Sequence, residues 1–132
     1  MKSMHFLHRC ILVANTKRKG RGVFTNEPLD KGVTIEVAPV IVMSNENRLL
    51  LDKTLLHDYI FEWGHDKKQC CIALGYIVLY NHAYKANCEY DMNFQKGLIT
   101  IRTVRAIKKG EELLINYNGD FDNPQPVWFD VK

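Results

Sequence analysis

Three short segments of the chain carry residues whose types could do chemistry. In the first, residues 19–24, Gly20 and Gly22 stand one residue apart between the cations Lys19 and Arg21. Glycine lets a backbone approach a ligand closely, and a neighbouring lysine or arginine can meet a carboxylate or a phosphate. A tight hairpin turn with solvated cations accounts for the same residues. A dinucleotide site is excluded, because no G-x-G-x-x-G opens a helix here.

The second segment places Asn81, His82 and Asn87 within a few residues of one another. Their amide and imidazole groups suit hydrogen bonding to an adenine edge, or they pin a loop to the body of the protein. A lone Asn-His pair is more often a satisfied turn than a ligand site, so both interpretations stay open. No Ser/Asp or Cys/His partner arrangement is identifiable, and triad hydrolysis therefore lacks support.

The third segment, residues 109–117, contains a predicted strand and ends on Tyr117 beside a polar break. A strand that ends in this way puts a phenol at a sheet edge, where its hydroxyl can point into a cleft. The alternative is a tyrosine that merely lies at an amphipathic rim.

In this order and at these separations, the three segments resemble the motifs of the SET-domain family of protein-lysine methyltransferases. KGRGVF is similar to the family's Gly-x-Gly motif, YNHAYKAN to its Asn-His motif and GEELLINY to its Glu-Leu…Tyr motif. The resemblance covers essentially the whole chain from about Cys10 to Tyr117. In size the chain is similar to the small SET proteins of viruses and some bacteria.

The resemblance implies a mainly β fold of several small sheets, with a knot-like C-terminal crossing and few short helices. It also implies S-adenosylmethionine on one face and a substrate lysine that enters a narrow channel from the other. The implied activity is N-methylation of lysine in a basic protein or peptide, such as a histone tail. The alternative is a SET-like module that binds a basic peptide or the cofactor without turnover.

The positions that match the family's motifs also imply individual roles. Tyr117 matches the catalytic tyrosine, and Tyr90 and Tyr59 are expected in the wall of the lysine channel. The residues expected to contact the cofactor are Lys19, Gly20, Arg21, Gly22, Asn81, His82 and Trp128. Among them the glycines offer close backbone contact, the two cations lie near the methionine carboxylate, and the tryptophan covers the adenine.

Several positions depart from the family's usual pattern, among them Ala83, Ala86, Ile115 and Phe121. Ala83 stands where the family usually has Ser, and Ala86 where it usually has Pro. Ile115 is aliphatic where many members carry the Phe or Tyr that limits how many methyl groups fit. The number of methyl groups transferred is therefore open.

The elements that must position these segments are short. Runs rich in Ile, Val, Leu and Thr between polar turns predict strands over 8–14, 33–43, 69–74, 98–106 and 112–116. An apolar stripe predicts a short helix up to about His57, followed by a strand. Residues 75–80 predict a single helical turn. The segments Leu29–Gly32 and Ile107–Gly110 repeat one turn pattern, in which glycine supplies a positive φ.

Length and composition indicate one globular domain. The 132 residues, 46% hydrophobic and 25% charged, predict a catalytic core over about 10–117 and a tail, 118–132, that packs over the site. A net charge of +3 is too small to indicate nucleic acid, and no direct nucleic-acid partner is expected. The basic cluster 17–21 keeps a small nucleic-acid-binding β domain as a third alternative.

The sequence also gives expectations about membrane contact, location, metal binding and oligomeric state. The longest apolar stretch, 70–80, is shorter than the about 20 residues that cross a bilayer, so no membrane partner is expected. A cytoplasmic location is expected, or the host nucleus for a viral protein or an effector. The four cysteines lack zinc-site spacing, which predicts buried thiols and no metal. Small size and the apolar segment 49–63 predict a homodimer.

Overall fold

The computed structural model describes residues 3–119 and 124–126 of the chain. Its strands are β1 (Phe6–Leu7), β2 (Ile11–Asn15), β3 (Arg21–Thr25), β4 (Thr34–Met43), β5 (Ile60–Trp63), β6 (Gln69–Ala73), β7 (Asn81–His82), β8 (Cys88–Asn93), β9 (Leu98–Thr103) and β10 (Glu112–Ile115). Its helical elements are the α-helix α1 (Asn45–Leu51) and the 3-10 helices η1 (Leu55–Tyr59) and η2 (Ile77–Leu79). The expected mainly β fold with few short helices is confirmed.

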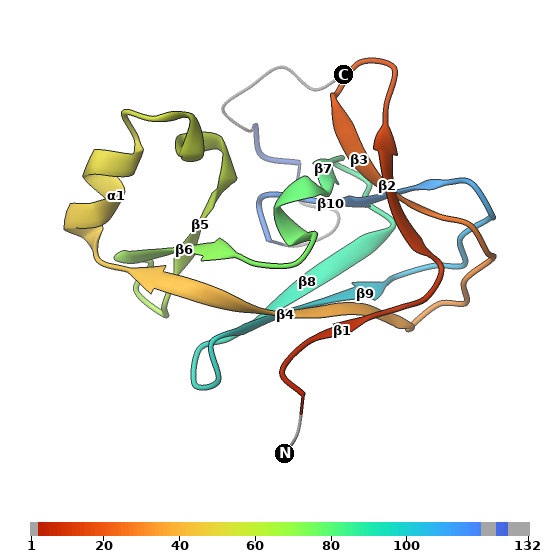
Figure 1. Cartoon of the computed structure of the whole chain (residues 1–132), viewed down its shortest axis with the longest axis horizontal. Helices are drawn as coiled ribbons and strands as arrows, with labels where there is room; N and C mark the ends of the chain where they lie inside the picture. The colour runs from red at the N-terminus through yellow and green to blue at the C-terminus, as the bar shows by residue number, and fades with distance from the viewer. Residues whose placement is uncertain (1–2, 120–123, 127–132) are drawn as a thin grey trace.

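The larger sheet is organised around β4. Its order is β5-β6-β4-β9-β8, and β1 also pairs with β4. The first part of β4 pairs with β9, and the part from Val40 to Met43 pairs with β6. Because one ten-residue strand serves two sets of partners, it connects the region that holds α1, β5 and β6 to the rest of the molecule (Figure 1).

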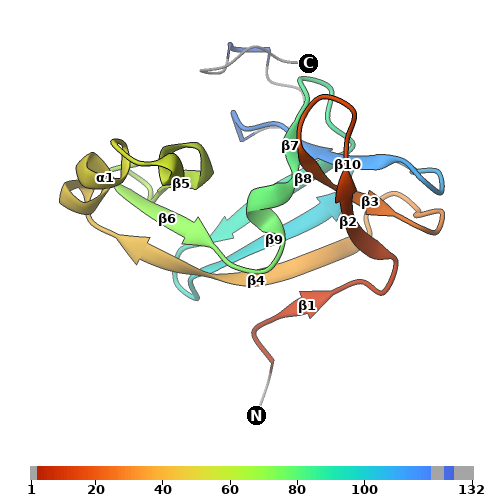
Figure 2. The same ribbon diagram turned by 45° about the horizontal axis from the view of Figure 1, so that its top comes forward.

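The smaller sheet carries the three motif segments. Its order is β2-β3-β10-β7, in which β10 pairs antiparallel with β3 and parallel with β7. Figure 2 shows these strands beside one another, above β4 and β9. The Asn-His segment and the C-terminal segment therefore lie side by side, as the family resemblance implied.

The core forms where the two sheets face each other, and burial of its apolar side chains drives the packing. Its large fully buried aliphatic and aromatic residues are Val23, Ile35, Ile77, Tyr80, Ile99, Ile101, Leu113 and Ile115. The two similar turns meet beside this core. Leu29 and Ile107 each donate a main-chain hydrogen bond to the other, at 2.9 and 2.8 Å. The repeated turn pattern thus places two equivalent positions in contact.

The predicted helix before His57 is only partly right. Helix α1 begins where the Ser44 hydroxyl accepts a hydrogen bond from the main-chain N–H of Asn47, and it ends at Leu51. The Thr54 hydroxyl then caps the separate helix η1. Neither helix buries a residue, so the apolar stripe that predicted one helix does not face the core. No helix within the described residues is long and apolar enough to cross a membrane.

The segment 19–24 also differs from a simple turn. Gly20 lies in the hairpin between β2 and β3, where the Thr16 hydroxyl and main-chain N–H both donate to its carbonyl oxygen. Gly22 lies within β3 and pairs with Ala14. The hairpin interpretation is therefore right for the first glycine, and the second belongs to a strand.

Candidate active site

Tyr117 lies two residues beyond the end of β10, next to the Asn-His segment. Its hydroxyl donates a 2.6 Å hydrogen bond to the main-chain oxygen of Tyr80, and its main-chain N–H donates to Nδ1 of His82 at 3.0 Å. Burial raises the pKa of the Tyr117 phenol above its usual value, and the Glu112 carboxylate raises it further. The phenol is therefore protonated at neutral pH, which makes it an orienting group rather than a general base.

A cleft of about 630 Å³ opens in front of Tyr117. The aromatic residues among its lining residues are Tyr59, Phe61, Tyr80, Tyr90, Phe94 and Tyr117. All three tyrosines predicted from the sequence are in this group. The Tyr90 hydroxyl donates to the main-chain oxygen of Tyr117 at 3.4 Å, and the Tyr90 ring meets Phe61 edge to face. A cleft with such walls can hold the aliphatic stem of a long side chain and strip water from its end.

The charges around this cleft are mixed. Its lining includes the carboxylates of Asp58, Glu62 and Asp91 and the cations of Arg48 and Lys67. Outside the channel itself, Arg102 lies 3.1 Å from Asp91 and 3.7 Å from Glu89. Any attraction of a basic peptide by Glu89 and Asp91 is therefore reduced by this arginine. The acidic residues Asp120 and Asp122 lie outside the described residues.

The Asn81 side chain joins two of the motif segments to its own. Its amide nitrogen donates to the main-chain oxygen of Arg21 at 3.0 Å and to Oε2 of Glu112 at 2.7 Å. Both amide hydrogens are thus used within the protein. A cofactor could therefore be contacted from Asn81 only by its amide oxygen or its main chain.

His82 contacts Tyr117 through a hydrogen bond and through ring packing. The side chain is buried, and its ring packs against the rings of Tyr84 and Tyr117, with centroids 4.6 and 5.2 Å away. Burial lowers the pKa of His82, and the positive charge of Lys19 lowers it further. The imidazole is consequently neutral at pH 7, as acceptance of the Tyr117 N–H by Nδ1 requires.

Gly20 and Gly22 serve different needs. Gly20 has φ +74°, and an added Cβ would meet nothing within 4 Å. At Gly22 an added Cβ would lie 2.5 Å from Oε2 of Glu112 and 3.0 Å from Nδ2 of Asn81. Gly20 is thus needed for the turn, whereas Gly22 lets the three motif segments approach one another.

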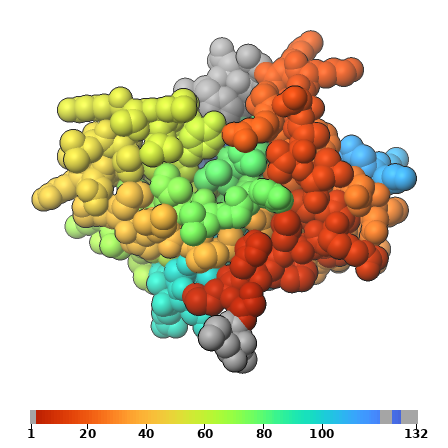
Figure 3. Space-filling model, in the orientation of Figure 1, coloured from red at the N-terminus to blue at the C-terminus, as the bar shows by residue number. Residues whose placement is uncertain are grey.

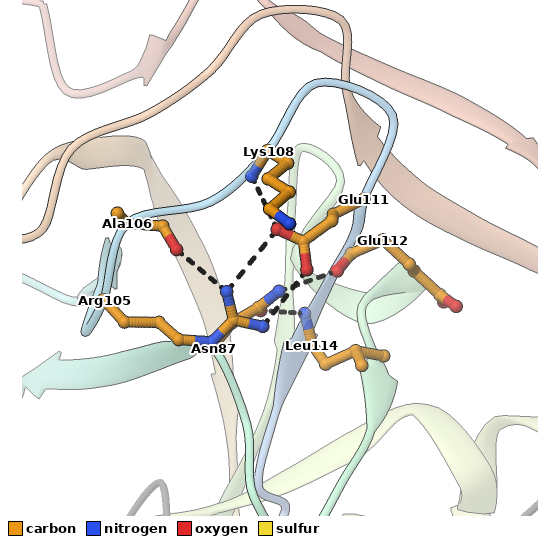
Figure 4. A network of polar contacts seen from close by, with 7 residues as sticks. All are labelled: Asn87, Arg105, Ala106, Lys108, Glu111, Glu112 and Leu114. Atoms are coloured by element: carbon orange, nitrogen blue, oxygen red, sulfur yellow. Dashed lines mark hydrogen bonds and ion pairs between the residues drawn. The ribbon is translucent and has the colours of Figure 1, made fainter.

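The contact between the Asn-His segment and β10 is completed by Asn87, a residue the sequence pointed to without a definite role. Figure 4 shows its amide between two main-chain groups of β10: Nδ2 donates to the oxygen of Glu112 and Oδ1 accepts from the N–H of Leu114, both at 2.8 Å. Beside it the Arg105 guanidinium pairs with Glu111. Asn87 therefore holds β10, the strand that precedes Tyr117, in place. This contact agrees with the interpretation in which the Asn-His segment is pinned to the body of the protein.

The cofactor residues predicted from the sequence come together only in part. Gly22, Asn81 and His82 lie on β3 and β7, the two strands that flank β10. Lys19 is near enough to His82 to affect its pKa. Arg21 is exposed and contributes its main-chain oxygen to Asn81. Trp128 lies outside the described residues. Within the described part of the chain, no three His, Cys, Asp or Glu residues are grouped so that they could hold a metal ion.

Sequence reasoning missed Tyr80 and Glu36. Tyr80 is buried, accepts the Tyr117 hydroxyl through its main-chain oxygen and donates its own hydroxyl to Glu36 at 2.9 Å. The one available signal was a carboxylate in the middle of the apolar run 33–43, since charged residues are rarely buried without a purpose.

Comparison with known proteins agrees with this geometry. Residues 20–118 match the SET domain family. The chain is 34% identical over 119 residues to a Schizosaccharomyces pombe protein named histone-lysine N-methyltransferase, H3 lysine-37 specific, covering 89% of this chain and 76% of that protein. It is also similar to the crystal structure of a candidate histone methyltransferase of Plasmodium falciparum, with a TM-score of 0.64, 27% identity, and coverage of 84% of this chain and 95% of the other.

Proposed function

The chain belongs to the SET-domain family of protein-lysine methyltransferases, and we propose that it transfers a methyl group from S-adenosylmethionine to a lysine of a histone or another basic protein. One observation carries the proposal. The Gly-x-Gly, Asn-His and C-terminal segments meet through Asn81, Gly22 and Glu112, and Tyr117, in the last of these segments, lines an aromatic cleft.

The cleft fits the needs of the acceptor. A lysine must attack as a neutral amine, and removing its proton near pH 7.4 from a pKa of about 10.4 costs roughly 4 kcal/mol. Aromatic walls formed by Tyr59, Tyr90 and Tyr117 disfavour the ammonium form by desolvation. The Tyr117 hydroxyl gives its hydrogen to Tyr80, so its oxygen lone pairs can accept an N–H of the amine and leave the nitrogen lone pair free.

The β2–β3 hairpin and Asn81 offer polar contacts for the proposed methyl donor. Bound S-adenosylmethionine supplies an electrophilic methyl group: a new N–CH₃ bond forms as the C–S bond breaks, and the electron pair of that bond stays on sulfur. Lys19 and Arg21 lie on the hairpin, where they can meet the donor's carboxylate. Exposed main chain at Gly20 and the Asn81 amide oxygen are available for its polar groups. The protein's task is alignment and exclusion of water rather than covalent catalysis.

The test is methyl transfer from radiolabelled S-adenosylmethionine to core histones and to lysine peptides, one of them an H3 peptide centred on lysine 37. Tyr117→Phe should lower incorporation at least tenfold, on the scale of lost hydrogen-bonded orientation. Tyr76→Phe is the matched control, because it removes a tyrosine hydroxyl outside the cleft. Equal incorporation by wild type and Tyr117→Phe would contradict the role of Tyr117.

Calorimetry with S-adenosylmethionine distinguishes the remaining alternatives. Binding without transfer to any substrate would favour the module that binds without turnover. Neither binding nor transfer would remove the methyltransferase proposal. Association with DNA that falls steeply with salt would instead support the nucleic-acid alternative based on residues 17–21.

We also propose that the protein forms a homodimer through α1 and η1. Leu50 is 65% exposed and Leu55 is 76% exposed, and Leu49 and Leu56 in the same two helices are exposed as well. These helices belong to the yellow region at the left of the space-filling view in Figure 3. An exposed apolar surface of this kind is typical of a protein interface. Light scattering at micromolar concentration tests it: a dimeric mass that becomes monomeric in Leu50→Glu would support the proposal, and a monomeric wild type would contradict it.

A further inference from the structure

The carboxyl group of Glu36 is fully buried in β4. It is the one Asp or Glu side chain of the described residues that is buried, and no ion pair neutralises it there. Burial of a carboxyl group is costly unless hydrogen bonds satisfy its oxygens. An apolar side chain would fill this place at lower cost, so the carboxyl group of Glu36 points to a role other than core packing.

Hydrogen bonds tie this carboxyl group to both ends of the segment 75–80. Oε2 accepts the main-chain N–H of Tyr76 at 2.7 Å, and Oε1 accepts the Tyr80 hydroxyl at 2.9 Å. Gly75 has φ +65°, and a Cβ added there would overlap Oε2. The chain therefore wraps closely around Glu36 before and after η2.

The same segment ends at Tyr80, which contacts Tyr117, the predicted catalytic tyrosine. Tyr80 is held by its ring hydroxyl on Glu36, while its main-chain oxygen accepts the Tyr117 hydroxyl at 2.6 Å. The position and direction of that oxygen determine where the single hydroxyl hydrogen of Tyr117 points. A hydrogen directed at Tyr80 cannot be donated to the lone pair of an incoming amine.

We infer that Glu36 is a positioning residue for methyl transfer: it anchors Tyr80, whose main-chain oxygen directs the Tyr117 hydroxyl so that the amine lone pair stays free to attack. Glu36 touches neither donor nor acceptor and acts only through Tyr80. The inference rests on the proposed function. It gives the buried carboxyl group of Glu36 on β4 a role in orienting Tyr117, which it reaches through Tyr80.

Steady-state kinetics with the best histone or peptide substrate tests the inference. Tyr80→Phe removes the anchor and keeps the ring and the main-chain oxygen. Its kcat should fall about tenfold, the scale of one orienting hydrogen bond, while KM for both substrates stays within about twofold. Tyr76→Phe should keep the wild-type kcat, because Tyr76 meets Glu36 through its main chain alone.

Two substitutions of Glu36 separate positioning from packing. Glu36→Gln keeps both contacts, because its amide oxygen can accept the Tyr76 N–H and its amide nitrogen can donate to the Tyr80 oxygen. It should retain kcat within about threefold of wild type, whereas Glu36→Leu should lose about as much as Tyr80→Phe. The double variant Glu36→Leu/Tyr80→Phe should lose no more than either single variant, as expected for residues that act as one unit.

The outcomes are distinguishable. Wild-type kcat in Tyr80→Phe, with only a lower melting temperature, would overturn the inference and leave the proposed function intact. Multiplicative losses in the double variant would also overturn it. A wild-type protein that transfers no methyl group would overturn the proposed function and this inference together. If Glu36→Leu does not fold, the comparison of Tyr80→Phe with Tyr76→Phe still decides.

Discussion

The main-chain N–H of Tyr117 donates a hydrogen bond to Nδ1 of His82 at 3.0 Å, so the histidine of one motif holds the tyrosine of another. The parallel pairing of β7 with β10, in register at Ile115 and His82, creates this contact. The hydrogen bond requires a neutral imidazole. This hydrogen bond therefore connects the protonation of His82 to the position of Tyr117, the predicted catalytic residue.

This connection predicts a pH dependence of stability. The pKa of His82 is lowered in the folded protein, whereas the unfolded chain binds a proton with a pKa of about 6.5. As pH falls below about 6.5 the unfolded state takes up a proton that the folded state refuses, so the unfolding free energy decreases. Urea unfolding from pH 7.5 to 5 should show a shallower decrease for His82→Asn, which keeps an acceptor for Tyr117.

His65→Asn is the control for that measurement, because His65 is exposed and lies against Phe94 rather than against Tyr117. It should keep the wild-type slope. An unchanged slope in His82→Asn would show that other groups cause the acid sensitivity.

The two glycines of the first motif should respond differently to alanine. Gly20→Ala places a Cβ in open space at φ +74°, which costs about 1 kcal/mol of stability through backbone strain. Gly22→Ala inserts a methyl group between Glu112 and Asn81, and it should lower affinity for S-adenosylmethionine at least tenfold because the contact between the motif segments must open. Calorimetric titration of both variants measures the difference.

Gly20→Asn provides the matched control for the turn, since asparagine tolerates a positive φ. It should recover part of the stability lost in Gly20→Ala. Equal cofactor affinity in Gly20→Ala and Gly22→Ala would contradict the division of roles between the glycines.

Asn87 should matter for stability and activity together. Asn87→Ala leaves the Glu112 oxygen and the Leu114 N–H without this partner in a part-buried place, which should cost roughly 2 to 4 kcal/mol. Chemical denaturation measures the cost. Asn93→Ala, which removes an exposed turn hydrogen bond to Lys96, should cost about 1 kcal/mol or less. Similar losses in the two variants would argue against a special role for Asn87.

The cysteines should be inert in the native protein. All four are buried, and burial raises the pKa of Cys71 and of Cys88 to about 12. Thiolates, which are the reactive form, are therefore scarce at pH 8. An aromatic disulfide reagent should label none of them quickly under native conditions and all four in denaturant. Fast native labelling of any cysteine would show that its surroundings open readily.

Periodicity predicted the strands that have one clear apolar face. Strands β4, β6, β9 and β10 lie within four of the five predicted runs, β2 extends one residue beyond the fifth, and the strand expected after the short helix is β5. Strand β8 was missed because its sequence, CEYDMN, has none of the Ile, Val, Leu and Thr residues by which the other strands were recognised, although its alternation of apolar and polar residues is typical of a strand at the edge of a sheet. Strand β3 was missed because Gly22 suggested a turn, whereas its lack of a side chain serves close packing within a sheet.

The site was predictable to the extent that motifs mark it. Tyr117, Tyr90 and Tyr59 all line the cleft, and the SET-domain resemblance is confirmed by the family match. Glu36 and Tyr80 have no local pattern, because their contact spans 44 residues and depends on how η2 folds over β4. The cofactor role of Trp128 stays a prediction.

The position of β10 between β3 and β7 has a consequence for folding. A strand inserted between two others can form its hydrogen bonds only after distant parts of the chain have been brought together, which is entropically costly and slow. Tyr117 stands two residues beyond that strand, so we expect the geometry around this predicted catalytic residue to be completed late in the folding reaction rather than during collapse. Refolding chains should regain their native secondary structure before they regain enzymatic turnover.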